Sequence, residues 1–151
     1  MTEELKIRVE DESRAKNRIK EVGADLEKKV SVKDTYFQGQ GEDELKITET
    51  GEGEFLRKYE KKDSGFQQVK NDEVENPDEK KQQLEQQFGI KTVQQKEISY
   101  YSLGDKTIIL NRIRNTGVFL IQGENVRKEF LEEELGFENS EYIEAPFSDL
   151  E

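Results

Sequence analysis

The chain has 151 residues, of which 31% are hydrophobic and 39% charged, and its 24 basic and 35 acidic side chains leave a formal net charge of -11. That balance argues against general nucleic-acid binding, because contacts with phosphate backbones need an excess of Lys and Arg, although local cationic pockets stay open. The chain holds no Cys and no His, which excludes disulfides, the usual zinc sites and nucleophilic catalysis by Cys or by a Ser-His pair.

The length predicts a single domain over residues 1–151. No apolar run approaches the roughly 20 residues of a membrane span, and the N-terminus lacks the apolar centre of a signal peptide. We therefore expect a cytoplasmic protein whose partner is neither a membrane nor a nucleic acid. Nothing in the sequence decides its oligomeric state.

The first predicted strand, residues 4–9, alternates charged and apolar side chains without a break. Neighbouring side chains of a strand point to opposite faces, so one face is apolar and the other is charged. The apolar face holds Leu5, Ile7 and Val9, and the charged face holds Glu4, Lys6 and Arg8. The charged face is either the solvent side of an ordinary sheet or the lumen side of a closed barrel.

A helix is predicted next, because Asp11 or Ser13 can cap its start and Gly23 can end it. Its buried stripe would be Ala15, Ile19 and Val22. A strand over 26–37 follows, and a strand over 44–48 then repeats the opening alternation. The apolar face of that strand holds Leu45 and Ile47, and the polar face holds Glu44, Lys46 and Thr48.

The rest of the chain adds five strands and two helices. The strands are predicted at 54–61, 66–75, 91–101, 106–113 and 117–122. A second helix begins at Asn76, because Pro77 suits the first helical position, and ends at Gly89. Its buried residues would be Leu84 and Phe88. A third helix, over 124–135, carries Val126, Phe130, Leu131 and Leu135 on one side.

This order of elements predicts an α+β fold, namely a closed eight-stranded antiparallel β-barrel, or tunnel, with flanking helices. The amphipathic helices need an apolar outer surface, so the charged strand faces would line a lumen that admits a small elongated ligand. Strand, capped helix, Gly and returning strand occur from Glu4 to Phe37 and again from Phe66 to Tyr101. The repetition suggests a duplicated half-barrel.

Four segments of the first half combine charged and aromatic residues in a recognisable order. A Glu-x-Glu-x-Lys pattern falls on Thr2, Glu4 and Lys6 with its first Glu replaced, and residues 34–37 read Asp-Thr-Tyr-Phe. Residues 45–48 read Leu-Lys-Ile-Thr, and residues 55–61 contain Lys58. In this order the segments resemble the CYTH superfamily of triphosphate tunnel proteins, which includes class IV adenylyl cyclases, thiamine triphosphatases and inorganic triphosphatases.

The resemblance implies a lumen in which Lys6, Lys46 and Lys58 hold the phosphate oxygens of a triphosphate-containing small molecule. It also implies Mg or Mn as cofactor, with Glu4 as a metal ligand, because hard cations take oxygen ligands and offset charge in phosphoryl transfer. From the residues alone, Glu4 is equally an ion-pair partner of Lys6 or Arg8, and Lys58 is equally a surface lysine.

The second half of the chain departs from the family pattern. Gln95 and Glu97 stand where a basic pair is expected, Asn111 replaces an Asp, and Ile121 and Gly123 replace two metal-binding Glu residues. We expect Glu97 to repel phosphate. Asn111 either offers a carbonyl oxygen to a cation or makes a structural hydrogen bond.

Two functions therefore stay open. One is a diverged metal-dependent enzyme on a triphosphate substrate, either a cyclase or a triphosphatase, whose catalytic residues the sequence leaves unassigned. The alternative is a non-catalytic protein that binds a polyanion or nucleotide. Because Glu4 is the one matched metal ligand and several cations are replaced, we expect weak binding and poor catalysis.

Overall fold

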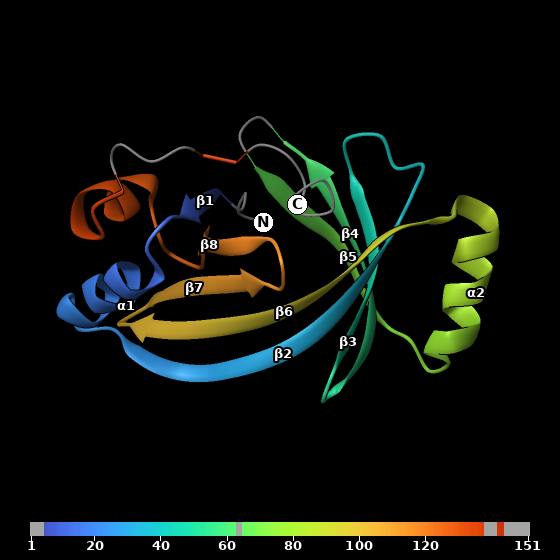
Figure 1. Ribbon diagram of the computed structural model, residues 1–151, viewed down its shortest axis with the longest axis horizontal. Coiled ribbons are helices and arrows are strands. Elements are labelled where there is room, and N and C mark those ends of the chain that lie inside the picture. The colour runs from blue at the N-terminus through green and yellow to red at the C-terminus, as the bar shows by residue number, and fades with distance from the viewer. Residues whose placement is uncertain (1–4, 63–64, 138–141, 144–151) are drawn as a thin grey trace.

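The computed structural model describes residues 5–62, 65–137 and 142–143, which form one eight-stranded antiparallel sheet with helices toward its two ends (Figure 1). The strands are β1 (Lys6–Val9), β2 (Asp25–Phe37), β3 (Glu44–Thr50), β4 (Gly53–Lys61), β5 (Phe66–Glu73), β6 (Ile90–Leu103), β7 (Lys106–Ile113) and β8 (Gly117–Gln122). The helices are α1 (Glu12–Glu21), α2 (Pro77–Phe88) and the short π-helix η1 (Phe130–Glu134). Every strand predicted from the sequence is present.

The sheet curls into a half-barrel, and the prediction of a closed barrel is wrong. Its order is β1-β8-β7-β6-β2-β3-β4-β5, so β1 and β5 are the edges, and no pairing among the described residues joins them. The four-residue strand β1 instead meets the segment 142–143: Ile7 pairs with Tyr142, and the Ile143 amide donates to the Lys6 carbonyl at 2.8 Å. While this segment holds the edge of β1, that edge is not free to pair with β5.

The chain passes twice through the same order of elements. The unit β1-α1-β2-β3-β4 is followed by β5-α2-β6-β7-β8, and a glycine with positive φ follows each helix, Gly23 at 91° and Gly89 at 85°, a conformation that residues with a Cβ rarely adopt. The long strands β2 and β6 pair at the centre, and the first strand of each unit pairs with the last strand of the other. This arrangement matches the repeat seen in the sequence.

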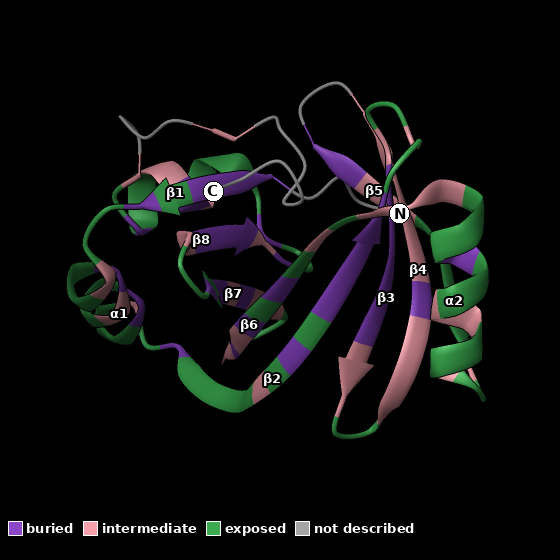
Figure 2. Cartoon of the chain, turned by 45° about the vertical axis from the view of Figure 1, so that its right-hand side comes forward, coloured by how far each residue is buried: buried purple, intermediate pink, exposed green. Residues whose placement is uncertain are grey.

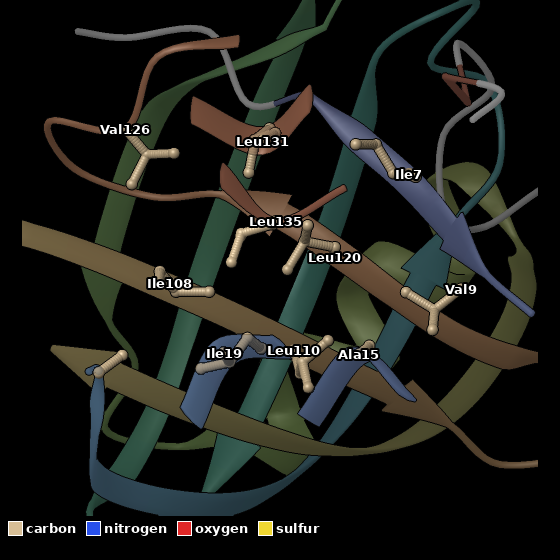
Figure 3. Close-up of a cluster of buried hydrophobic side chains, with 11 residues drawn as sticks. Ile7, Val9, Ala15, Ile19, Ile108, Leu110, Leu120, Val126, Leu131 and Leu135 are labelled. Atoms are coloured by element: carbon tan, nitrogen blue, oxygen red, sulfur yellow. The ribbon is translucent and has the colours of Figure 1, made fainter. Parts of the chain in front are cut away.

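On the convex face, α1 and the segment 126–135 pack over β1, β7 and β8 (Figure 3). The Asp11 side chain caps α1 by accepting from the Arg14 amide at 3.1 Å. The shared cluster contains Ile7, Val9, Ala15, Ile19, Ala24, Ile108, Leu110, Leu120, Val126, Leu131 and Leu135. The third helix predicted over 124–135 begins later in the structure, at residue 128, and continues into η1. Asn125 takes a left-handed conformation, with φ of 60°, that an α-helix cannot contain.

At the other end of the sheet, α2 packs on the convex side of β3 and β4. The cluster between this helix and the sheet contains Phe37, Leu45, Ile47, Leu56 and Leu84. The Gln-rich side of α2 is exposed, as Figure 2 shows. Leu84 is thus buried as predicted. Among the residues that the structure describes, no helix is long and apolar enough to cross a membrane.

Alternation along the strands separates this apolar convex face from a concave face, which we call the lumen. Ile7 and Ile47 lie in the convex clusters, whereas Lys6 and Lys46 line the lumen. The facing predicted for 4–9 and 44–48 is therefore confirmed for the described residues. A smaller apolar cluster lies on the concave side and contains Tyr36, Ile113, Phe119 and Ile121.

Candidate functional site

The lumen holds a cavity of about 100 Å³ whose walls are rich in charge. Its charged lining residues are Lys6, Asp34, Glu44, Lys46, Arg57 and Lys96. Four cations thus face two carboxylates, and all of these side chains except Arg57 are buried. Charges buried in this way are costly unless they are paired or meet a ligand, so the lumen is the candidate site.

A larger hollow, of about 1060 Å³, lies beside α1. Its charged residues are Arg8, Glu10, Asp11, Arg14, Arg18 and Glu21. Three cations and three carboxylates balance there, and every one of them is exposed. Water already solvates such groups, so this hollow has less need of a ligand than the lumen.

Asp34 is the hub of the lumen, with 1% of its surface exposed. Its Oδ2 lies 2.7 Å from Lys96 Nζ and 3.0 Å from Lys46 Nζ, and its Oδ1 accepts from the Thr48 hydroxyl at 2.5 Å. Lys96 also donates to the Tyr36 hydroxyl at 2.6 Å. These donors meet because β3 and β6 flank β2 on either side and present Lys46 and Lys96 to the same face as Asp34.

The pKa values follow from this geometry. Burial would raise the pKa of the Asp34 carboxyl, but the charges of Lys46 and Lys96 outweigh it and hold that pKa well below its usual range. Burial and the charge of Lys46 lower the pKa of Lys96 to about 8, although Asp34 opposes this shift. Burial also works against the Lys46 ammonium, but Asp34 outweighs it and raises the pKa of Lys46. At neutral pH the three groups together therefore carry a net positive charge.

The open side of the half-barrel is spanned by a side-chain contact between its two edges. Lys6 of β1 places its Nζ 4.3 Å from the centre of the Phe66 ring on β5, and Lys61 Nζ lies 5.3 Å from the same ring. A cation over an aromatic face is attracted by the ring's quadrupole. This contact holds Lys6 at the cavity, where the sequence places it.

On the opposite wall, β7 and β8 present fewer charges. Asn111 is buried in the lumen, and its Oδ1 has no hydrogen-bond partner in the part of the chain that the structure describes. Ile121 lines the same cavity, as the alternation requires, but brings an apolar side chain. A Cβ at Gly123 would lie 2.0 Å from the Thr107 carbonyl oxygen, so Gly123 has no room for the Glu that the resemblance places there.

Lys58 does not lie where the sequence analysis puts it. In the β3-β4 ladder Leu45 pairs with Lys58, and Lys46 pairs with Arg57. Paired residues share a face, so Lys58 lies on the convex side with Leu45, whereas Arg57 and Tyr59 are the residues of β4 that line the lumen. The strand 54–61 has no clean alternation of apolar and polar residues, so the sequence leaves the facing of Lys58 open.

Lys96, like Asp34 and Arg57, is a site residue that the sequence did not reveal. It pairs with Val32 and lines the cavity, whereas Glu97 lies on the other face and contacts Lys29 and Arg112. The expectation that Glu97 repels phosphate in the lumen is therefore wrong. Glu97 points to the opposite face of the sheet, and its neighbour Lys96 faces the lumen. Matching Tyr100-Tyr101 to Tyr36-Phe37 across the repeat would have placed Lys96 and Tyr100 on the lumen side.

The resemblance implies a divalent metal ion, for which the described residues form no cluster of ligands. Among them no group of three or more Asp, Glu, His or Cys side chains could hold one, and both oxygens of Asp34 already meet donors. Glu4, the predicted metal ligand, lies outside the described residues. Mg or Mn as a cofactor stays a prediction.

No protein-family model and no curated protein sequence matches the chain, but solved structures do. A protein of Pyrococcus horikoshii is 22% identical with a TM-score of 0.77, over 100% of this chain and 94% of that one. A conserved protein of Pyrococcus furiosus is 17% identical with a TM-score of 0.82, over 99% of both chains. A Vibrio parahaemolyticus protein, provisionally assigned as an adenylate cyclase, is 15% identical with a TM-score of 0.60, over 85% of this chain and 78% of that one.

These likenesses concern the fold. TM-scores of 0.60 to 0.82 over most of the chain show that these structures share its fold, at identities of 15–22%. A shared fold hosts many functions, so the activity has to be argued from the lumen residues.

Proposed function

We propose that the protein is a CYTH-like tunnel protein that binds a polyanion, either a triphosphate or the phosphate end of a nucleotide, in its lumen. The observation that carries the proposal is the convergence of four cations, Lys6, Lys46, Arg57 and Lys96, on one small cavity. Ammonium and guanidinium donors form strong charge-assisted hydrogen bonds with phosphate oxygens. Because the chain as a whole is acidic, with a net charge of -11, this local excess of cations does not follow from composition.

The cavity limits what the lumen can hold. Pockets for drug-sized ligands usually measure about 300 to 1,000 Å³, whereas this cavity measures about 100 Å³. It suits roughly one phosphate group. The rest of a longer ligand would extend through the open side of the half-barrel, past Lys6 and Phe66.

Metal-dependent phosphoryl transfer is the second candidate function. It is favoured by the likeness to proteins of Vibrio parahaemolyticus and Bacillus halodurans that are provisionally assigned as adenylate cyclases. Catalysis of this kind usually needs an ion anchored by one or two carboxylates, and Asp34 is already engaged by Lys46 and Lys96. We therefore place binding ahead of catalysis. Metal-dependent turnover of ATP or tripolyphosphate, abolished by Glu4→Gln, would reverse this order.

Titration calorimetry with tripolyphosphate tests the binding proposal. Lys6→Met keeps most of the apolar stem and removes the charge, and we expect it to weaken the affinity about tenfold or more, the usual effect of losing a charge-assisted hydrogen bond. Lys58→Met makes the same substitution on the convex face of β4 and should leave the affinity unchanged. An equal loss in both variants, or none in either, would place the binding site outside the lumen.

A further inference from the structure

We infer that the Asp34 carboxylate occupies the place in the lumen where an oxygen of an anionic ligand would bind. It thereby decides which anions can enter. The inference rests on the proposed function. Three donors from the neighbouring strands converge on this carboxylate, Lys96 at 2.7 Å, Lys46 at 3.0 Å and the Thr48 hydroxyl at 2.5 Å. The Tyr36 hydroxyl of β2 also donates to it, at 3.5 Å. Two ammonium groups and a hydroxyl around one oxyanion are also the kind of donors that a phosphate oxygen would use.

A bound anion would compete with Asp34 for the same hydrogen-bond donors. Asp34, Lys46, Thr48 and Lys96 all line the cavity, so an anion in the cavity reaches the donors that Asp34 holds. It has to share them with the carboxylate or displace it. A monovalent anion would exchange one negative charge for another, whereas an anion with several charges would also attract Lys6 and Arg57 on the surrounding walls.

Asn111 supplies a separate indication that the cavity is incomplete without a ligand. Its side chain is 4% exposed, and its Oδ1 accepts no hydrogen bond from the described residues. A buried acceptor without a donor costs free energy. A hydrogen phosphate group carries charged oxygens, which Lys46 and Lys96 attract, and also a hydroxyl, which can donate a hydrogen bond to Asn111 Oδ1. The selected ligands are therefore compact multivalent oxyanions such as hydrogen phosphate and polyphosphate, in preference to chloride or simple carboxylates.

The experiment compares wild type with Asp34→Asn in a phosphate-free buffer of low ionic strength. Without an anion the variant leaves Lys46 and Lys96 without the carboxylate that contacts both of them, so its thermal midpoint should fall. Added tripolyphosphate should raise the midpoint of the variant more than that of wild type, and calorimetry should show an affinity about tenfold tighter. Chloride at equal ionic strength should not substitute.

Two controls accompany this variant. Asp72→Asn removes an exposed carboxylate that lies 3.5 Å from Lys70, and it should respond to tripolyphosphate as wild type does. Asp34→Asn combined with Lys46→Met removes one lysine together with the carboxylate. This double variant should lose the additional stabilisation by tripolyphosphate.

The outcomes separate the inference from the proposed function. If Asp34→Asn binds tripolyphosphate no more tightly than wild type and gains no additional stabilisation, Asp34 is a structural ion-pair partner, and the inference fails even where wild type binds. If Asp34→Asn binds tripolyphosphate and wild type does not, the proposed function is wrong. The inference that Asp34 keeps anions out of the lumen is then supported. A variant that folds only with tripolyphosphate also supports it, and one that stays unfolded in both conditions overturns it.

Discussion

A single carboxylate, Asp34, joins three strands through the side chains of Lys46, Thr48 and Lys96. Removing one member of a buried ion pair commonly costs about 3–5 kcal/mol, because the other charge stays buried without compensation. Asp34 therefore contributes strongly to the free energy of unfolding. It also controls the charge that the lumen presents to a ligand.

The low pKa of Asp34 predicts an acid-sensitive part of the stability. Because that pKa lies below the usual value of 3.8, the folded state holds the ionised carboxylate at a pH where the unfolded chain already takes up a proton. This stabilisation is present above pH 3.8 and is lost as the pH falls toward the folded pKa, with a total of about 2 kcal/mol or more. Urea unfolding at pH 7, 4 and 3 should show a smaller loss for Asp34→Asn than for wild type. Parallel losses in the two proteins would contradict the assignment.

At the scale of the single strand, the sequence predicts correctly which side chains face the lumen where apolar and polar residues alternate clearly. Strands 4–9 and 44–48 alternate cleanly, and Lys6 and Lys46 face the lumen as predicted. The strands that carry Lys58 and Lys96 mix polar residues on both sides, so the sequence alone does not decide which face is buried. A shift of one residue reverses every side chain of a strand, and this is why Arg57 and Lys96 were missed.

The helix α2 contacts the sheet through a narrow apolar side, of which Leu84 is the fully buried residue. Leu84→Ala should therefore lower the free energy of unfolding by about 2–5 kcal/mol, as large-to-small core substitutions do. The matched substitution Gln86→Ala lies on the exposed side and should change it by less than about 0.5 kcal/mol. Chemical denaturation of both variants measures the difference, and equal effects would show that α2 does not depend on this contact.

At the scale of the whole molecule, the half-barrel is held together by strand pairing between its two repeated units. β1 of the first unit pairs with β8, and β5 of the second unit pairs with β4. The central β2-β6 ladder also joins one unit to the other. Neither unit can therefore keep all its strand pairings when the other unfolds.

This strand pairing between the two units predicts one cooperative unfolding transition. Far-ultraviolet circular dichroism reports the whole sheet, and the fluorescence of the five tyrosines reports their surroundings in a chain that has no Trp. The two signals should give the same midpoint in urea, the usual mark of two-state unfolding. Two separate midpoints would show that the units unfold independently.

The sequence by itself determined what depends on neighbours along the chain: the eight strands, the lumen positions of Lys6 and Lys46, and the positive-φ glycines after both helices. Side-chain spacing and local hydrogen bonds are enough to specify these features. Only the tertiary structure decided that Lys96 meets Asp34 and that residues 142–143, rather than β5, occupy the edge of β1. Contacts between distant segments depend on the register of a curled sheet, which local spacing does not specify.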